Sequence, residues 1–542
     1  MRKAVLVLVL SAVICAQTPE GRIEQIIQSY VSDHTFMGTV LIAKGDNTVL
    51  DKGYGYANLE WQIPNTPDTK FRLGSVTKQF TAASVLLLEE RGKLKTDDLI
   101  KKYLPDAPAA WDRITIFHLL THTSGIPSFT ELPEYPVLAK NAATPQDLVG
   151  HFKDKPLEFE PGSKFKYSNS GYLLLGYLID KVSGEKYPQF VNENIFKPLG
   201  MNNSGYDSNA TIIPHRASGY TKTPSSNEIQ NTGYIDMTIP YSAGALYSTT
   251  RDLLKWEKAL YGGKLLKPES LRKMTTPYKD NYAFGLLISE AGGHKKYAHG
   301  GGIEGFNTEL AYYPDDHLAV IALANLNGAA PGEIATKAAT IELGGTVKLP
   351  SERTQITLTP DQINAITGTY SIGPGVDMSV FTEEGKLMTQ LTGQPKFPLF
   401  SESPTLLFLK VVDAQLEFAK DVNGKATQVT LYQAGQSHVA KRTGDYKPAA
   451  ERKEITLSPA QIDAITGTYS LAASADLSVT AEDGKLMTQL TGQPKLPIFA
   501  ESPTLLFLKI VDAQLEFALG PDGKATQVTL HQGGRDQIAK RK

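Results

Sequence analysis

The sequence predicts an α/β domain followed by two all-β barrel repeats. Residues 17–345 mix helix and strand signals, with strands at both ends and helices between them, which is typical of α/β layers around one sheet. The remainder repeats itself: ITLTPDQINAITGTYS from Ile356 returns as ITLSPAQIDAITGTYS from Ile455. A chain of 542 residues is also too long for a single core, since domains usually hold about 100 to 200 residues.

The N-terminus has the pattern of a secretory signal peptide over residues 1–16. Arg2 and Lys3 form its charged part, residues 4–14 its apolar part, and Ala16 suits cleavage. We therefore expect a secreted or periplasmic protein, without another segment apolar enough to span a membrane. Cys15, the only cysteine, would leave with the signal, so we expect no disulfide and no Cys-ligated metal. The alternative is a lipoprotein anchored through Cys15, although Ile14 stands where such sites need a small residue.

Two elements of the α/β domain, residues 17–345, bear on its chemistry. Residues 75–94 predict a buried helix, because small and apolar residues are followed by a charged end and Gly92. Residues 307–324 alternate around a Pro-Asp-Asp turn and predict a β-hairpin. The domain should thus carry an antiparallel sheet flanked by helices.

The two repeats, residues 355–442 and 454–542, correspond without a gap, and Tyr370 returns as Tyr469, 99 residues later. Each copy holds about eight short alternating runs separated by turns such as Asn423-Gly424, which favour tight hairpins. We expect each copy to close into a small antiparallel barrel, since closure removes unpaired strand edges. Residues 443–453 predict the linker between them.

Charge excludes some classes of partner. The chain has 55 basic and 57 acidic side chains, a formal net charge of −2, which gives no electrostatic footprint for nucleic acid or an anionic membrane. The expected partner is a small-molecule or peptide substrate, for example one derived from peptidoglycan.

Ser75 and Lys78 form a Ser-x-x-Lys tetrad at the start of the predicted helix. A serine hydroxyl needs a base, and a lysine three residues later lies one turn away on the same helix face. The spacing also occurs at Ser163, Ser183 and Ser270, but those copies fall in a turn or on a charged surface helix. We therefore expect Ser75 to be the nucleophile.

Two further motifs complete the candidate site. Tyr167 and Asn169 precede an apolar helix; a phenol beside ammonium groups can be held partly ionised and relay a proton, and an amide can orient substrate. His299, Gly301 and Gly302 lie in a glycine-rich strand, where a backbone N–H near Gly302 could complete an oxyanion hole.

Other patterns are less informative. The glycines from Gly300 to Gly305 match a dinucleotide fingerprint, but a strand rather than a helix follows them. His118 and His122 have the spacing of zinc ligands without the catalytic Glu, and we expect a packed or site-lining pair. We expect no metal and no cofactor.

In this order, Ser75-x-x-Lys78, Tyr167-x-Asn169 and His299-x-Gly301 resemble the three motifs of the serine β-lactamase and penicillin-binding protein superfamily. The flanking text, such as ITIFHLLTHTSGIP and HGGGIEGF, resembles the class C-like branch, which includes D-alanyl-D-alanine carboxypeptidases, D-aminopeptidases, esterases and β-lactamases. The tail repeats are similar to lipocalin-like barrels appended to some of these enzymes.

The resemblance implies a β-lactamase/transpeptidase-like fold with a helical subdomain and a definite set of roles. Ser75 is acylated, Lys78 and Tyr167 share proton transfer, Asn169 binds the substrate amide, and N–H groups of Ser75 and Gly302 hold the oxyanion. Many family β-lactamases have Lys where this chain has His299, and a neutral imidazole anchors a substrate carboxylate less firmly.

We therefore expect a serine hydrolase acting on a small amide or ester, most of all a D-amino-acid-type peptidase or an esterase. A β-lactamase is one alternative, and a non-catalytic penicillin- or peptidoglycan-binding receptor is another. A third alternative is that the barrels carry the main function of the protein by binding an apolar ligand or a partner. The substrate and the oligomeric state are not evident from the sequence.

Overall fold

The computed structural model describes residues 18–223, 228–349, 352–373, 376–392, 394–433, 436–446, 452–472, 475–482, 485–491, 495–509, 513–532 and 535–542. The predicted signal peptide, Cys15 included, and part of the predicted linker lie outside these residues. The described residues group into two compact units, one holding most of the α/β domain and the other the two barrels. Every described helix is too short or too polar to cross a bilayer.

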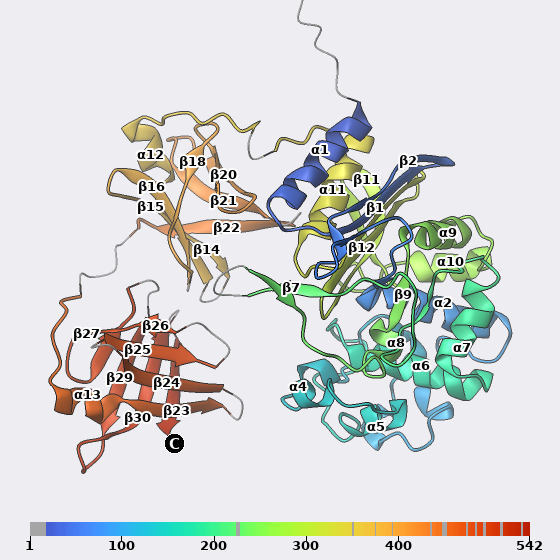
Figure 1. Cartoon of the computed structure of the whole chain (residues 1–542), viewed down its shortest axis with the longest axis horizontal. Coiled ribbons are helices and arrows are strands. Elements are labelled where there is room, and N and C mark those ends of the chain that lie inside the picture. Colours follow the sequence, from blue (N-terminus) through green and yellow to red (C-terminus); the bar gives the residue numbers. More distant parts are fainter. Residues whose placement is uncertain are drawn as a thin grey trace, which may run out of the picture. The chain divides into compact units, whose positions relative to one another are not determined.

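The α/β domain is built on an antiparallel six-stranded sheet of order β10-β11-β12-β13-β1-β2 (Figure 1). Its strands are β1 Gly38–Lys44, β2 Asn47–Tyr54, β10 Leu287–Ala291, β11 His294–Ile303, β12 Phe306–Tyr313 and β13 Leu318–Ala324. The central strand β13, LAVIALA, is buried along its whole length, as expected of a strand covered on both faces. The predicted hairpin over residues 307–324 is confirmed, with Asn307 opposite Ala324.

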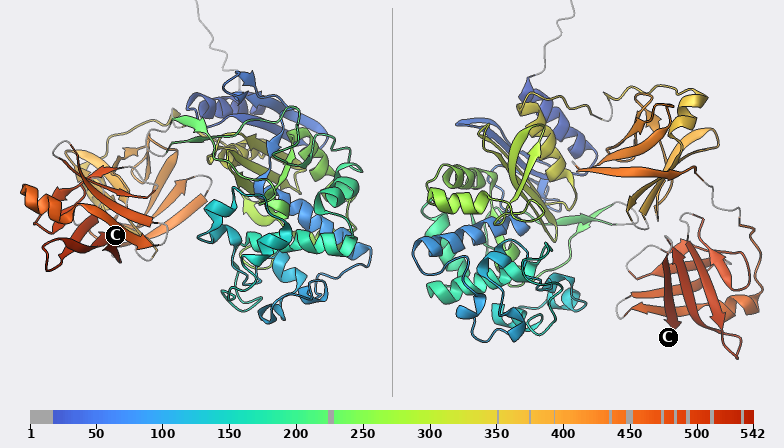
Figure 2. Two further views of the ribbon diagram at one scale, coloured as in Figure 1. Left: turned by 60° about the horizontal axis from the view of Figure 1, so that its bottom comes forward. Right: turned by 180° about the vertical axis from the view of Figure 1, so that it is seen from behind.

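Helices cover both faces of this sheet. The helices α1 and α11 pack on each other, α11 also lies against β13, and α9 packs on β1 and β13 (Figures 1 and 2). The helices of the domain are α1 Pro19–Ser32, α2 Thr77–Glu90, α3 Ile116–Leu120, α4 Tyr135–Leu138, α5 Pro145–Gly150, α6 Asn169–Ser183, α7 Tyr187–Val191, α8 Tyr241–Gly244, α9 Thr250–Tyr261, α10 Pro268–Thr275 and α11 Ala330–Glu342. Several, among them α2, α3 and α6, form the predicted helical subdomain.

Shorter elements connect these parts. The 3₁₀ turns are η1 Gly74–Val76, η2 Ile100–Lys102, η3 Ala109–Trp111 and η4 Phe129–Glu131, and η5 Asn192–Phe196 is a π-helical turn. The short strands are β3 Tyr56–Asn58, β4 Ile63–Pro64, β5 Phe71–Arg72, β6 Gly205–Tyr206, β7 Tyr220–Lys222, β8 Ile229–Asn231 and β9 Leu246–Ser248. The small sheet β5-β9-β6 holds the backbone that leads into Ser75.

The predicted helix over residues 75–94 is shorter than expected. It begins as the turn η1, continues as α2 and ends at Glu90, and Gly92 follows with a φ of 68°. Every side chain from Thr77 to Leu88 is buried, as predicted, because helices α6, α7, α8 and α10 pack around α2. The charged residues Glu89 to Arg91 lie at the helix terminus just before Gly92, as predicted.

The first repeat is a nearly closed antiparallel barrel with a short helix, α12 Pro360–Ile366. Its described strands are nine rather than the expected eight: β14 Gly368–Gly373, β15 Val376–Glu383, β16 Lys386–Leu391, β17 Phe397–Pro398, β18 Phe400–Ser401, β19 Leu406–Phe408, β20 Ala414–Lys420, β21 Ala426–Gln433 and β22 Gln436–Gly444. The sheet begins with β17 and ends with β18, and only Leu399 separates these two strands in the chain. That adjacency curls the sheet almost into a ring.

The second repeat has the same order of elements. Helix α13 Pro459–Ile465 precedes β23 Gly467–Ala472, β24 Ala475–Glu482, β25 Lys485–Leu490, β26 Leu496–Pro497, β27 Phe499–Ala500, β28 Leu505–Phe507, β29 Ala513–Leu519, β30 Ala525–Gln532 and β31 Arg535–Arg541. Both interiors are packed apolar cores centred on equivalent tyrosines, Tyr370 and Tyr469. The predicted fold class, an α/β domain followed by two all-β barrels, is confirmed.

Candidate active site

Ser75 lies in the turn η1, where the chain passes from β5 into α2. Gly74 permits this turn because its φ is 53°, a region that other residues rarely adopt. A Cβ atom on Gly74 would lie 2.8 Å from the amide nitrogen of Gly302, so strand β11 passes directly against the turn. The first and third motifs are thereby brought together at the backbone level.

Lys78 is fully buried, and its Nζ has three oxygen neighbours. Nζ lies 3.0 Å from Ser75 Oγ, 2.9 Å from Asn169 Oδ1 and 2.8 Å from the carbonyl oxygen of Ala243. Burial lowers the pKa of Lys78 well below its ordinary value, which favours the neutral amine. A neutral amine donates two hydrogens, which the amide and the carbonyl oxygens accept, and its lone pair is left for the Ser75 hydroxyl. Lys78 is therefore placed as a base for Ser75.

The other three Ser-x-x-Lys tetrads have a different electrostatic setting. Each of their lysines pairs with a carboxylate: Lys166 with Glu158 at 2.5 Å, Lys186 with Asp180 at 3.3 Å, and Lys273 with Glu89 at 3.0 Å. Among the described residues, Lys78 has no such partner. The carboxylate partners of these three lysines therefore distinguish them from Lys78.

Tyr167 and Asn169 stand where α6 begins, and both face Lys78. The ring centroid of Tyr167 lies 4.9 Å from Lys78 Nζ, and the Tyr167 hydroxyl is hydrogen-bonded to the Ser75 side chain. Burial raises the pKa of Tyr167 despite that bond, so the phenol stays neutral rather than partly ionised as the sequence suggested. Asn169 donates through Nδ2 to Thr130 Oγ1 at 3.0 Å and accepts from Lys78, so both ends of its amide already bind protein.

His299 is buried and held in one tautomer. Its Nδ1 lies 2.6 Å from the carbonyl oxygen of Gly300, which can only accept, so Nδ1 carries the hydrogen. Its Nε2 lies 3.0 Å from Tyr282 Oη and accepts from that hydroxyl. Burial lowers the pKa of His299 to about 4, and the ring is neutral at pH 7. The expected neutral imidazole is thus fully engaged with protein groups.

Of the three glycines that follow His299, Gly301 is the one that packing requires. A Cβ atom on Gly301 would lie 2.0 Å from the carbonyl oxygen of Leu73 and 2.3 Å from Thr308 Oγ1. The absence of a side chain on Gly301 thus lets β11 approach the backbone just before Ser75. Gly302 is the residue whose N–H lies beside the nucleophile's turn.

A cavity of about 480 Å³ opens beside these groups. Ser75, Tyr167, His299 and the three glycines from Gly300 to Gly302 line one part of it, and the start of α11 lines another. Among the described residues that line it none is Lys or Arg, and the one carboxylate is Glu309, which pairs with Lys296 at 3.3 Å. The cavity therefore offers no cation to a substrate carboxylate.

Two further residues, Tyr282 and His122, support the site. Tyr282 comes from the loop before β10, and no spacing rule connects it with His299. His122 packs its ring 4.2 Å from the ring of Tyr167 and accepts at Nδ1 from the N–H of Ser168 at 3.1 Å. The other histidine of that pair, His118, takes part in the cap of α3 instead. No cluster of metal-ligating side chains occurs in the described part of the chain.

The chain is similar to known proteins in both parts. Residues 23–344 match the family model described as Beta-lactamase, and residues 352–446 and 451–541 match a domain of unknown function, DUF3471. Penicillin-binding protein 4* of Bacillus subtilis (strain 168) is 30% identical over 451 residues, which cover 79% of this chain and 99% of that protein. The alignment is longer than the matched β-lactamase segment, so it extends into the repeats.

Solved structures give the same result. The penicillin binding protein from Bacillus halodurans superposes with a TM-score of 0.53 at 32% identity, covering 58% of this chain and 98% of that one. D-amino acid amidase from Ochrobactrum anthropi SV3, complexed with L-phenylalanine amide, has a TM-score of 0.54 at 25% identity and covers 60% of this chain and 100% of that one.

Proposed function

Since the chain belongs to the β-lactamase family and is a serine hydrolase of that fold, we propose that it cleaves small amides or esters of D-amino acids through an acyl-enzyme on Ser75. The observation that carries the proposal is the buried Lys78, whose Nζ lies 3.0 Å from Ser75 Oγ and whose pKa is lowered by burial.

The chemistry follows from the placement of these groups. Lys78 takes the proton of Ser75 as Oγ attacks the substrate carbonyl carbon, and the N–H groups of Ser75 and Gly302 stabilise the resulting oxyanion. Tyr167, bonded to Ser75, passes a proton to the departing amine or alcohol, and its own proton is restored from Lys78. Water then attacks the acyl carbon and releases the acid and Ser75.

Charge in the cavity supports the substrate class. Both ring nitrogens of His299 are occupied, and no Lys or Arg is among the described residues of the lining, so a substrate carboxylate such as that of a penicillin finds no partner. Glu309 is the carboxylate of the described lining, and although its Oε1 pairs with Lys296 at 3.3 Å, it offers an acceptor to a substrate ammonium group. Together these features favour a D-amino-acid amide with a free amine over a penicillin or a C-terminal D-Ala-D-Ala peptide.

A substrate panel tests the proposal. Turnover by the parent protein, by Ser75→Ala and by Ser163→Ala is measured on five substrates: D-alanine amide, L-alanine amide, p-nitrophenyl acetate, a D-Ala-D-Ala peptide and nitrocefin. We expect the D-amide to be the best amide substrate, Ser75→Ala to abolish turnover, and Ser163→Ala to match the parent. Equal turnover by Ser75→Ala and the parent would refute the proposal, and fast nitrocefin turnover would favour a β-lactamase.

A receptor that forms a lasting penicillin adduct is the second candidate. The similarity to penicillin-binding protein 4* favours it. Labelling with a fluorescent penicillin separates the two: a stable adduct that is absent from Ser75→Ala supports the receptor, whereas rapid loss of the label supports the enzyme.

The predicted signal peptide supports a place outside the cytoplasm, where D-amino-acid peptides from peptidoglycan are available. Fractionation of cells that express the full chain tests this, and recovery of the protein in the cytoplasm at full length would contradict it.

A further inference from the structure

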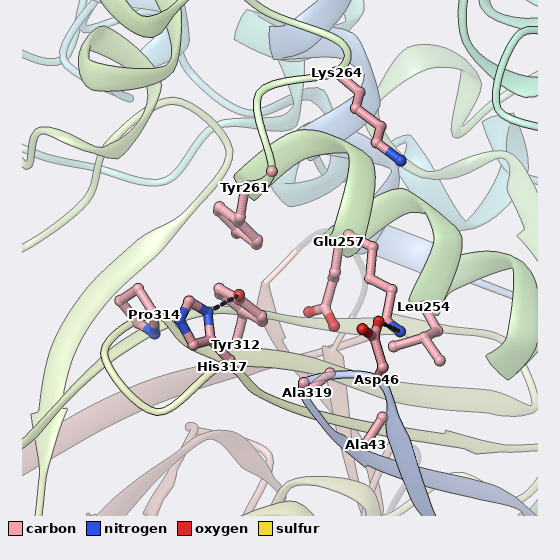
Figure 3. Close-up of a pocket in the computed structure, with 13 residues that line it drawn as sticks. Ala43, Asp46, Leu254, Glu257, Tyr261, Lys264, Tyr312, Pro314, His317 and Ala319 are labelled. Carbon is pink, nitrogen blue, oxygen red and sulfur yellow. Dashed lines mark hydrogen bonds and ion pairs between the residues drawn. The ribbon is translucent and has the colours of Figure 1, made fainter.

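A second cavity, of about 400 Å³, lies at the far end of strand β12 from the active site (Figure 3). Tyr312 lines this distal cavity, whereas Asn307, at the opposite end of the same strand, lines the active-site cavity. The two cavities share no lining residue. A volume of this size is within the range of small-molecule sites.

The distal cavity contains a carboxyl group that nothing in the α/β fold explains. Glu257 occupies a core position of α9, in register with the buried residues Leu253, Trp256 and Leu260, where an apolar side chain is expected. It is 1% exposed, and its Oε2 has no hydrogen-bond partner among the described residues. Burial raises the pKa of Glu257 well above its ordinary value, because an unpaired carboxylate is costly there.

The walls around this carboxyl group are aromatic and apolar. The rings of Tyr261 and Tyr312 stack with centroids 4.4 Å apart and an interplanar angle of 8°. Ala43, Leu254 and Ala319 supply small and apolar surface beside Glu257 (Figure 3). Aromatic rings beside a carboxylate suit an organic cation.

The other charged groups of the distal cavity leave Glu257 without a neutralising partner. Lys258 Nζ pairs with Asp46 at 3.2 Å, Lys264 is exposed at the margin, and His317 Nδ1 lies 3.4 Å from Tyr312 Oη. A single carboxyl group is too few oxygen ligands for a divalent metal. An anion would be repelled once Glu257 ionises.

We propose that the distal cavity binds a small organic cation, a primary ammonium with a short apolar tail, whose head donates to the Glu257 carboxylate while its tail packs on Ala43, Leu254 and Ala319. The ammonium supplies the partner that Oε2 lacks. The site is separate from the proposed hydrolytic chemistry and does not depend on it.

Calorimetry on the full chain tests the site with n-propylammonium, n-propanol and propionate, which share a tail but differ in the head. We expect saturable binding of propylammonium at least tenfold tighter than that of propanol, and no binding of propionate. Glu257→Gln keeps the shape and removes the charge, so it should abolish the tenfold preference while p-nitrophenyl acetate turnover stays at the parental level.

A proton count on the parent protein needs no variant. Burial raises the pKa of Glu257 and pairing with ammonium favours its ionised form, so titrations in buffers of different ionisation enthalpy should show proton release with propylammonium and none with propanol. Equal affinity for propylammonium and propanol, or a Glu257→Gln variant that keeps the preference, overturns the proposal. Binding without proton release also overturns the pairing with Glu257.

Discussion

Replacing Gly301 with alanine should damage both stability and turnover, because the added methyl group has no space. Its Cβ atom would lie 2.0 Å from the carbonyl oxygen of Leu73, a main-chain atom that cannot rotate away. Relief requires β11 to move from the Ser75 turn by more than about 1 Å. Overpacking of this kind costs about 1 to 3 kcal/mol, and we expect about 3 kcal/mol here. A displacement near 1 Å at a reacting group lowers turnover about 100-fold.

The neighbouring Gly300 provides the matched control. A Cβ atom on Gly300 would meet Glu309 Oε2 at 3.1 Å, the end of a flexible side chain. Gly300→Ala should therefore cost less than about 1 kcal/mol, in line with small steric adjustments. Urea unfolding gives the free energy of unfolding, and p-nitrophenyl acetate hydrolysis gives kcat/KM. If the two variants are equal in both measurements, the approach of Gly301 to Leu73 does not position Ser75.

Three more predictions concern the polar groups of the site. Glu309→Gln should raise KM for D-alanine amide about fivefold, the loss of roughly 1 kcal/mol of charge attraction, and leave p-nitrophenyl acetate unchanged; equal effects on both substrates would count against an ammonium site. Tyr282→Phe leaves the buried Nε2 of His299 without a donor and should cost about 1 to 3 kcal/mol in urea unfolding, whereas Tyr278→Phe, at an exposed ring, should cost nothing measurable. The pKa of His299 is about 4 when folded and about 6.5 when unfolded, so its contribution is complete above about pH 6.5 and is lost as the pH falls toward 4. The loss of stability at pH 5 should amount to about 2 kcal/mol. A His299→Gln variant whose free energy of unfolding falls as steeply as that of the parent between pH 8 and 5 would contradict this.

The sequence was informative wherever a local pattern carries the structure. The return of Tyr370 as Tyr469 predicted two equivalent barrels, and the alternation of residues 307–324 predicted the hairpin that is observed. It was less informative about very short strands: β17 and β18 have two residues each, too few for an alternating pattern, and the barrels therefore have one strand more than expected.

For the candidate site, the sequence predicted which residues take part better than it predicted their protonation. Ser75, Lys78, Tyr167, Asn169 and His299 were predicted from motifs, and the fold brings them together. Their electrostatics were harder to predict, because burial depends on the whole fold. Nearby ammonium groups suggested a partly ionised Tyr167, but burial has the larger effect on its pKa.

No sequence pattern predicted the roles of two residues, Tyr282 at the candidate active site and Glu257 at the distal cavity. Tyr282 donates to Nε2 of His299 from 17 residues earlier in the chain, with no spacing rule that connects them. Glu257 sits within an amphipathic pattern that predicts only a helix facing the core.

The near-identity of the two barrels has a consequence for biosynthesis. Strands β16 and β25 have the same sequence, KLMTQL, so either could pair with β15 or β24. Only two residues, Glu384 and Gly385, join β15 to β16, and both have positive φ, as a tight hairpin requires. Such a hairpin closes within microseconds, long before the ribosome has delivered the second copy. Vectorial synthesis thus protects the barrels from exchanging strands, a protection that a chain diluted from denaturant does not have.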